Sequence, residues 1–90
     1  MLPPEMYVNY VTRRKNDLSE LNKAYSENNF EPFKRLGHQI KGNAASFGFN
    51  ELAQMGIQME EAAVSTDKND ALKLLSDFEQ WIKKTEETIK

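Results

Sequence analysis

The sequence predicts an all-α protein, an antiparallel up-and-down four-helix bundle. Apolar residues recur at steps of three and four along four segments of the chain, which is the period of an α-helix. No segment alternates between apolar and polar residues in the manner of a β-strand. The breaks between the four segments are short and polar, and short connections place consecutive helices side by side in opposite directions.

The first helix is expected over about 4–27. Pro3-Pro4 followed by an acidic residue suits a helix start, because proline is tolerated there and a carboxylate favours the positive end of the helix dipole. Only Arg14 interrupts the apolar stripe. A bend near 12–15 is compatible with the sequence. This segment therefore forms either one long helix or two end-to-end helices, of which the first would be a short extra N-terminal helix. The stripe consists of Tyr7, Val11, Leu18, Leu21 and Tyr25.

The second helix is expected over about 30–47. Asn29 can cap it through its side-chain oxygen, and Pro32 falls in the first turn, where its missing N–H costs little. Gly48 is expected to end this helix, because glycine adopts the left-handed conformation that helix C-termini favour.

The third helix is expected over about 51–65 with Asn50 as its cap, and Thr66 or Asp67 is expected to cap the fourth helix. Methionines at helical spacing are interpreted as core residues rather than ligands. Trp81 is expected to cover the edge of the last stripe. The third helix carries Leu52, Met55, Gly56, Met59 and Ala63 on one face, and the fourth carries Leu72, Leu75, Phe78, Ile82, Thr85 and Ile89.

Length and composition favour one soluble domain, residues 1–90, since a second core would not fit in 90 residues. There are no cysteines, which excludes disulfides and thiolate metal sites and is compatible with a cytoplasmic location. No signal peptide is predicted at the N-terminus, and no apolar run approaches the roughly 18–20 residues of a membrane span. We therefore expect a cytoplasmic monomer that does not bind membranes.

The charge of the chain argues against a nucleic-acid partner. Twelve basic and 14 acidic residues give a net charge of −2, so no overall positive field attracts nucleic acid. The one short basic cluster, Arg13-Arg14-Lys15, is interpreted as solvated helix surface rather than as a DNA contact.

The second helix contains the only histidine, His38. At about 100° per residue, the apolar residues of this helix fall about 160–240° away from His38, so the imidazole is expected to face solvent. Lys34 and Lys41 lie one turn to either side of it on the same face. A solvated neutral imidazole has a lone pair on one ring nitrogen and is a competent nucleophile near pH 7.

Two glycines beside His38 require an explanation, because each costs roughly 0.5–1 kcal/mol relative to alanine inside a helix. Gly42 lies one turn from the imidazole, and its missing side chain leaves the ring edge open to a partner. Gly37 lies about 100° away on the helical wheel and is better placed to let a neighbouring helix come close.

Glu60 is a candidate partner of the imidazole. His38 lies ten residues before Gly48 and Glu60 ten residues after Asn50, so in an antiparallel hairpin both lie about 15 Å from the turn. A carboxylate at this level can accept the Nδ1–H, fix the tautomer and leave Nε2 as the nucleophile. The alternative, a surface glutamate beside Glu61, stays open.

The pattern His38-x-x-Lys41-Gly42, followed by small residues, Phe47-Gly48 and Leu52, resembles the active helix of histidine-containing phosphotransfer (HPt) domains. The resemblance extends over nearly the whole chain. It implies that His38 is phosphorylated, that Lys41 supports the phosphoryl group and that Gly42 leaves room for a receiver domain. Lys34 can assist, because a phosphoryl group brings close to two negative charges.

As a member of that family, the chain would be a phosphorelay intermediate between response-regulator receiver domains, with a hybrid sensor kinase as a further partner. The receiver would supply Mg²⁺ and the aspartate, so no cofactor or metal of its own is expected. The sequence has no P-loop or kinase signature, and we expect a phosphocarrier without ATP-dependent kinase activity. A free-standing protein and a domain of a larger kinase are both compatible with the sequence.

The leading alternative is a non-catalytic helical adaptor that binds a protein through an exposed apolar patch, with Met6, Tyr10 and Phe30 as contacts. Such an adaptor would carry no phosphate. A metal or haem bundle lacks ligands, because one histidine and no cysteine are present and Glu60-Glu61 is not part of an E-x-x-H pair.

Overall fold

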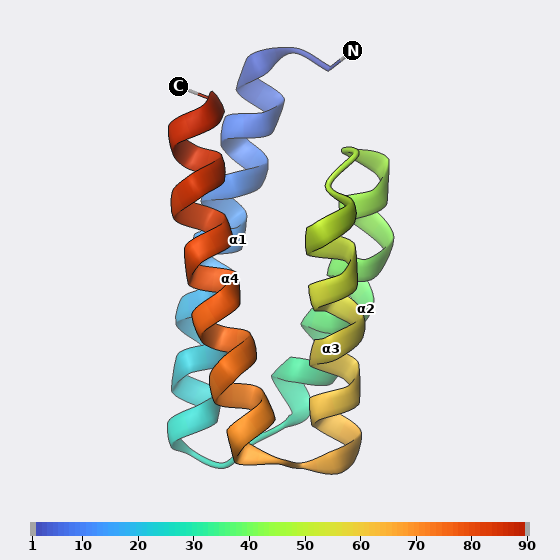
Figure 1. Cartoon of the computed structure of the whole chain (residues 1–90), viewed down its shortest axis with the longest axis vertical. Coiled ribbons are helices and arrows are strands. Elements are labelled where there is room, and N and C mark those ends of the chain that lie inside the picture. The colour runs from blue at the N-terminus through green and yellow to red at the C-terminus, as the bar shows by residue number, and fades with distance from the viewer. Residues whose placement is uncertain (1, 90) are drawn as a thin grey trace.

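The computed structural model describes residues 2–89, so residues 1 and 90 of the predicted domain lie outside the described residues. Its elements are α1 Pro4–Ser26, α2 Glu31–Ser46, α3 Asn50–Ser65 and α4 Lys68–Ile89. Successive helices run in opposite directions, and the start of α1 lies at the same end of the bundle as the end of α4 (Figure 1). The predicted antiparallel four-helix bundle is confirmed.

The N-terminal segment is one continuous helix. α1 spans 23 residues without interruption. Of the two predicted alternatives, the single long helix is confirmed, and the described part of the chain has neither a break near 12–15 nor a short extra N-terminal helix.

Arg14 is buried, with 7% of its surface exposed, so the interpretation of the basic cluster as solvated surface is wrong at this residue. Its guanidinium carbon lies 4.4 Å from the centre of the Tyr10 ring, and its Nε lies 2.7 Å from Oδ2 of Asp17. Asn43 of α2 joins the group, because its Oδ1 accepts hydrogen bonds from the Tyr10 hydroxyl (2.5 Å) and from Arg14 Nη1 (3.4 Å). An ion pair and a cation–π contact thus compensate the buried charge.

The C-terminal end of α2 follows the sequence prediction, and the N-terminal end follows it in part, because Phe30 rather than Asn29 occupies the N-cap position and makes no side-chain capping hydrogen bond. The Asn29 side chain accepts a hydrogen bond from the backbone N–H of Glu31 (3.2 Å), and Pro32 lies in the first turn. After the helix, Gly48 has a φ of +78°, in the left-handed region where a side chain would be strained.

The starts of α3 and α4 differ from each other. Asn50 is the first residue of α3 and makes no capping hydrogen bond there, so its predicted capping role is wrong. Asp67 does cap α4, because its Oδ1 accepts hydrogen bonds from the backbone N–H groups of Asn69 (2.9 Å) and Asp70 (3.3 Å).

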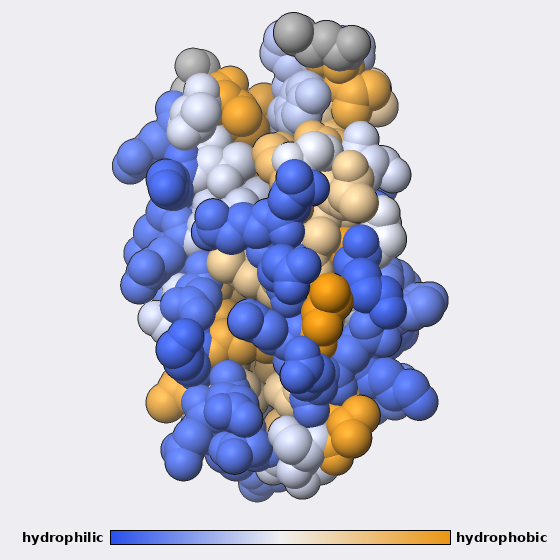
Figure 2. Space-filling model, turned by 45° about the vertical axis from the view of Figure 1, so that its right-hand side comes forward, coloured by the Kyte–Doolittle hydropathy of each residue, from blue (hydrophilic) through white to orange (hydrophobic). Residues whose placement is uncertain are grey.

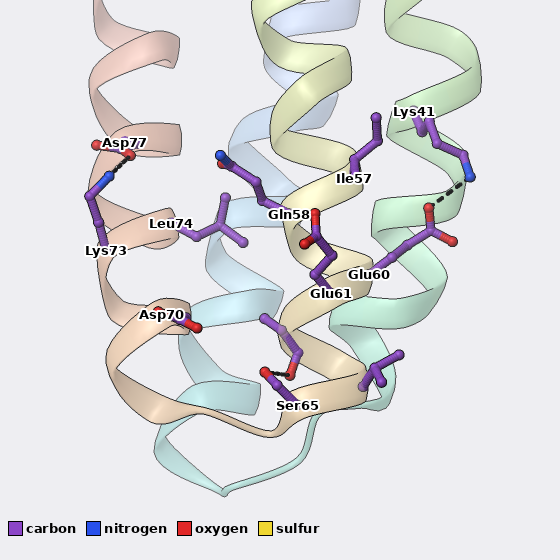
Figure 3. Close-up of a pocket in the computed structure, with 12 residues that line it drawn as sticks. Lys41, Ile57, Gln58, Glu60, Glu61, Ser65, Asp70, Lys73, Leu74 and Asp77 are labelled. Atoms are coloured by element: carbon purple, nitrogen blue, oxygen red, sulfur yellow. Dashed lines mark hydrogen bonds and ion pairs between the residues drawn. The ribbon is translucent and has the colours of Figure 1, made fainter.

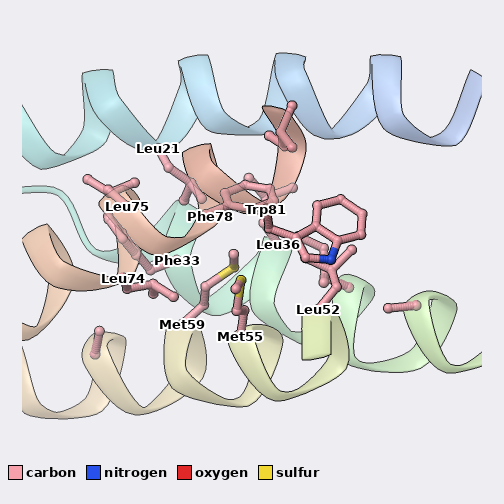
Figure 4. Close-up of a cluster of buried hydrophobic side chains, with 14 of the residues drawn as sticks. Leu21, Phe33, Leu36, Leu52, Met55, Met59, Leu74, Leu75, Phe78 and Trp81 are labelled. Carbon is pink, nitrogen blue, oxygen red and sulfur yellow. The ribbon is translucent and has the colours of Figure 1, made fainter. Parts of the chain in front are cut away.

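Side chains from all four helices meet in one core, in which Met55 and Met59 are buried as predicted (Figure 4). In α3 the buried alanine is Ala62, and the predicted Ala63 is only half-buried. In α4 the predicted Leu72 is 54% exposed. The buried stripe of α4 has three positions per seven residues rather than two, which places Leu72 outside it. This stripe consists of Ala71, Leu74, Leu75, Phe78, Trp81 and Ile82.

Five aromatic residues attach the α2–α3 turn to the outer helices, namely Tyr7, Tyr10, Phe47, Phe49 and Trp81. α1 and α4 have 23 and 22 residues, against 16 in α2 and in α3, and extend beyond this turn (Figure 1). Tyr7 packs edge-on against Phe47 and Phe49, with ring centres 5.7 and 5.9 Å apart, and Phe49 meets Trp81 at 5.2 Å. Such edge-to-face pairs stabilise beyond the area that they bury.

Candidate functional site

His38 faces solvent from the middle of α2. Its side chain is 76% exposed, as the helical period predicts. The opposite face of α2 is anchored in the core by Phe33, Leu36, Ile40 and Ala44. The imidazole is therefore carried on a helix fixed by packing, while the ring itself stays accessible.

The carboxylate of Glu60 lies between Lys41 and His38. Lys41 Nζ is 2.9 Å from Glu60 Oε1, and His38 Nδ1 is 3.7 Å from Glu60 Oε2. The second distance is longer than a hydrogen bond, so the imidazole faces the carboxylate without being bonded to it. Glu60 thus lies at the predicted level of the hairpin, across from His38.

The ion pair between Lys41 and Glu60, which Figure 3 shows joining α2 to α3, was not predicted. The helical wheel of α2 nevertheless indicates that Lys41 points toward a neighbouring helix. Lys41 lies about 60° from His38 on the side of Gly37, the side that was expected to face a neighbouring helix.

The same contact changes the acidity of Glu60. The hydrogen bond from Lys41 holds the pKa of Glu60 below its ordinary value of 4.5, against a smaller opposing effect of desolvation, and the charges of Lys41 and His38 lower it further. Glu60 is therefore an anion at neutral pH, and its two oxygens can stabilise the positively charged or proton-bearing nitrogens of Lys41 and His38.

The space beside the imidazole is open at Gly42. A Cβ atom placed there would meet no heavy atom within 4 Å. The missing side chain is thus not required by packing, which agrees with the interpretation that it gives access to the ring. Lys34 is exposed one turn before His38, and within residues 2–89 no ion pair links it to the His38, Lys41 and Glu60 group.

The backbones of α2 and α3 meet directly on the side of the site. A Cβ at Gly37 would lie 2.7 Å from the carbonyl oxygen of Gly56 and 2.9 Å from the backbone nitrogen of Glu60. A Cβ at Gly56 would lie 2.6 Å from the backbone nitrogen of Lys41. The close approach expected at Gly37 is confirmed, and its partner Gly56 had been interpreted only as a member of the core face.

A groove runs along α3 beside the site, and its walls carry charged side chains (Figure 3). Lys41 and Glu60 border it on one side, and the ion pair of Lys73 and Asp77 (3.3 Å) borders it on α4. Hydrophilic residues also cover most of the face shown in Figure 2. Apolar side chains of Ile57, Val64 and Leu74 also line the groove, so the surroundings of the site combine charged and apolar groups.

The apolar patch expected for an adaptor is not assembled. Of its three predicted contacts, Met6 is 42% exposed, but Tyr10 is buried at 5% and Phe30 packs partly buried against the core. The prediction that Tyr10 is a surface contact is wrong, because the ring packs under Arg14 and against Phe47 (4.3 Å between ring centres).

No group of three or more histidine, cysteine, aspartate or glutamate side chains in the described residues is placed to hold a metal ion. None of the helices between residues 2 and 89 combines the length and the apolar character that crossing a bilayer requires.

Comparison with protein families gives one match. A family model described as the Hpt domain matches residues 5–88, a span that includes nearly all of the four helices. Neither the comparison with curated proteins nor the comparison with solved structures found a match.

Proposed function

Because this chain belongs to the Hpt domain family, whose members transfer phosphoryl groups in two-component signalling, we propose that it is a phosphorelay intermediate. In this proposal His38 accepts a phosphoryl group from the aspartyl phosphate of one receiver domain and passes it to the aspartate of another. The observation that supports it most is the solvent-exposed imidazole with a carboxylate on its Nδ1 side.

The transfer step uses Nε2, the ring nitrogen on the side away from Glu60. Its lone pair attacks phosphorus, the Nε2–P bond forms, and the bond from phosphorus to the aspartate oxygen breaks with its electrons leaving on the carboxylate. Nδ1 keeps its proton, so the ring gains positive charge. The Glu60 carboxylate, 3.7 Å from Nδ1, stabilises that charge. The reverse step moves the group to a second aspartate.

The neighbouring residues then have separate roles. Lys41, one turn from His38, supplies positive charge to the phosphoryl group. Lys34 adds charge from the other side. Gly42 leaves the approach to the ring free, since no heavy atom lies within 4 Å of its absent Cβ.

Hpt domains interact with receiver domains and kinases, and they carry phosphoryl groups without kinase activity of their own. We propose receiver domains as the direct partners of this chain, with a hybrid sensor kinase as a further partner. Mg²⁺ and the accepting aspartate would come from the receiver. No nucleotide or metal of this chain takes part in the proposed step.

The test is incubation of the chain with a panel of phosphorylated receiver domains, followed by detection of acid-labile phosphate. His38→Gln should accept none, and its free energy of unfolding should stay within about 0.5 kcal/mol of the wild type because the side chain is exposed. Gln80→Ala, on the exposed face of α4, serves as the control that still accepts phosphate.

Two results would contradict the proposal. Label that persists in His38→Gln would place the phosphate elsewhere, and a wild-type chain that no receiver labels would leave the adaptor as the better reading. A large loss of stability in His38→Gln would contradict the accessible placement of the ring.

A further inference from the structure

The site depends on a close contact between two helices, and the residues in that contact are glycines. We propose that Gly37 and Gly56 are positioning residues, which hold α3 at the distance from α2 where the Glu60 carboxylate reaches both Lys41 and His38. The role of this contact in transfer rests on the proposed function, whereas its geometric effect on Glu60 does not.

The contact is reciprocal, and apart from the Cβ of Met59, 2.8 Å from the absent Cβ of Gly37, it is made by backbone atoms. A Cβ at Gly37 would lie 2.7 Å from the carbonyl oxygen of Gly56, and a Cβ at Gly56 would lie 2.9 Å from the carbonyl oxygen of Gly37. Backbone atoms inside a helix cannot turn aside as the end of a flexible side chain can. A methyl group at either position would therefore push the two helices apart.

Some of the atoms that fill this space belong to the site residues Lys41 and Glu60. The absent Cβ of Gly56 would lie 2.6 Å from the backbone nitrogen of Lys41, and that of Gly37 would lie 2.9 Å from the backbone nitrogen of Glu60. Any shift that relieves such a contact moves the backbone of Glu60 relative to that of Lys41. The contact and the ion pair are thus coupled through the same two residues.

The shift needed is large compared with the tolerance of the ion pair. Moving from 2.6 Å to the 3.4 Å at which ordinary contact begins requires about 0.8 Å. The Lys41–Glu60 contact is 2.9 Å, near the ideal length of a hydrogen bond, and hydrogen bonds weaken steeply when stretched. The His38–Glu60 distance of 3.7 Å is already at the limit of a direct interaction.

This explanation also gives a reason for glycine in both helix interiors, where it is disfavoured relative to alanine. Gly37 and Gly56 are buried in the contact, in contrast to Gly42, which faces open space. The two kinds of glycine in α2 therefore serve different purposes, one for spacing and the other for access.

The first experiment introduces Gly56→Ala into the whole chain and follows the Glu60 carboxyl by NMR during a pH titration. The pKa of Glu60 should rise toward its ordinary value of 4.5, because its contact with Lys41 is stretched. The control Ile82→Val weakens the core at α4, away from the contact, and should leave this titration unchanged. A titration unchanged by Gly56→Ala would overturn the proposal.

The second measurement is the rate of phosphoryl transfer from a receiver. Gly56→Ala should slow it about tenfold, since a 1 Å misplacement at a site can cost up to roughly a hundredfold. In a chain that already carries Glu60→Gln, adding Gly56→Ala should have little further effect, because both changes act through the same carboxylate. Equal slowing with and without Glu60→Gln would show that the glycine is merely structural and would overturn the proposal.

Glu60→Asp keeps the test decisive if Gly56→Ala does not fold. It leaves the glycine contact intact and withdraws the carboxylate by up to about 1.5 Å, one carbon–carbon bond. The carboxyl should then titrate near the ordinary pKa of aspartate, about 3.9, and transfer should slow as in Glu60→Gln. A depressed pKa with full transfer in Glu60→Asp would show that the spacing is not matched to glutamate and would overturn the proposal.

The two proposals can fail separately. If the Glu60 titration responds as expected but no receiver labels His38, the phosphorelay function is wrong and the positioning by glycines stands. If His38 is labelled and the Glu60 titration does not respond, the phosphorelay function stands and the positioning by glycines is wrong.

Discussion

The two flanks of α2 are held by different kinds of contact. Toward α3, backbone meets backbone at Gly37 and Gly56, and no atom can be added without displacing a helix. Toward α1, side chains make the contacts, through the Asn43 amide, the ion pair of Arg35 with Glu20 and the packing of Tyr10 on Phe47. The comparison teaches that direct backbone contact sets the spacing on the flank beside the catalytic candidates, whereas side chains set the spacing on the other flank.

The carboxylates on the two flanks show the same difference. Glu60 is stabilised as an anion, because Lys41 donates to it at the rim of the bundle and lowers its pKa. Burial raises the pKa of Asp17 on α1 above its ordinary value of 3.8, although the neighbouring Arg14 opposes this. The Glu60 carboxylate beside His38 is thus negatively charged at neutral pH. The Asp17 carboxylate on α1 instead compensates the charge of the buried Arg14.

The largest effect is expected from Gly37→Val, which adds three carbon atoms where even one would lie 2.7 Å from the opposite backbone. Overpacking of this kind should lower the free energy of unfolding by about 3 kcal/mol, measured in urea. Gly42→Val is the matched control, because it makes the same change on the same helix in open space. Equal losses in the two variants would show that helix propensity, not the contact with α3, determines the cost.

A smaller loss is expected from Arg14→Met on the α1 flank. The substitution keeps most of the apolar stem but removes the guanidinium that pairs with Asp17 at 2.7 Å. Leaving that half-buried carboxylate without its partner should cost about 1–3 kcal/mol of unfolding free energy. Arg13→Met, at the exposed neighbouring position, should stay within about 0.5 kcal/mol of the wild type. If both variants unfold alike, the buried ion pair contributes nothing measurable.

The smallest change in stability, and in the opposite direction, is expected from Gly42→Ala. The added methyl group meets no atom, so the better helix propensity should raise the free energy of unfolding by about 0.5–1 kcal/mol. Transfer from a receiver should nevertheless become slower, and slower still in Gly42→Met, because the side chain stands one turn from the imidazole. A rate in Gly42→Met equal to that of the wild type would count against the access interpretation.

Periodicity was sufficient for the features that depend on one helix alone. The exposure of His38 and the burial of Met55 and Met59 follow from the angle at which each residue leaves its helix. The position of Glu60 needed one further assumption, that the α2–α3 hairpin is antiparallel and has a short turn.

Features that require a particular partner on another helix were not predicted. Arg14 is buried because Tyr10 and Asp17 on α1 and Asn43 on α2 provide its contacts, and Asn43 lies 29 residues away in the sequence. The need for glycine at position 56 is visible only once Gly37 and Lys41 of α2 are seen to lie against it. A sequence pattern gives the direction of a side chain but not the identity of the atoms that it meets.

The aromatic cluster over the α2–α3 turn has a practical consequence. Trp81 is the only tryptophan of the chain; it is 7% exposed and touches Phe49, which follows directly after the turn. The fluorescence of its indole therefore reports whether the hairpin that carries His38 is seated on α4. Opening of that hairpin can be followed without a label attached anywhere near the imidazole.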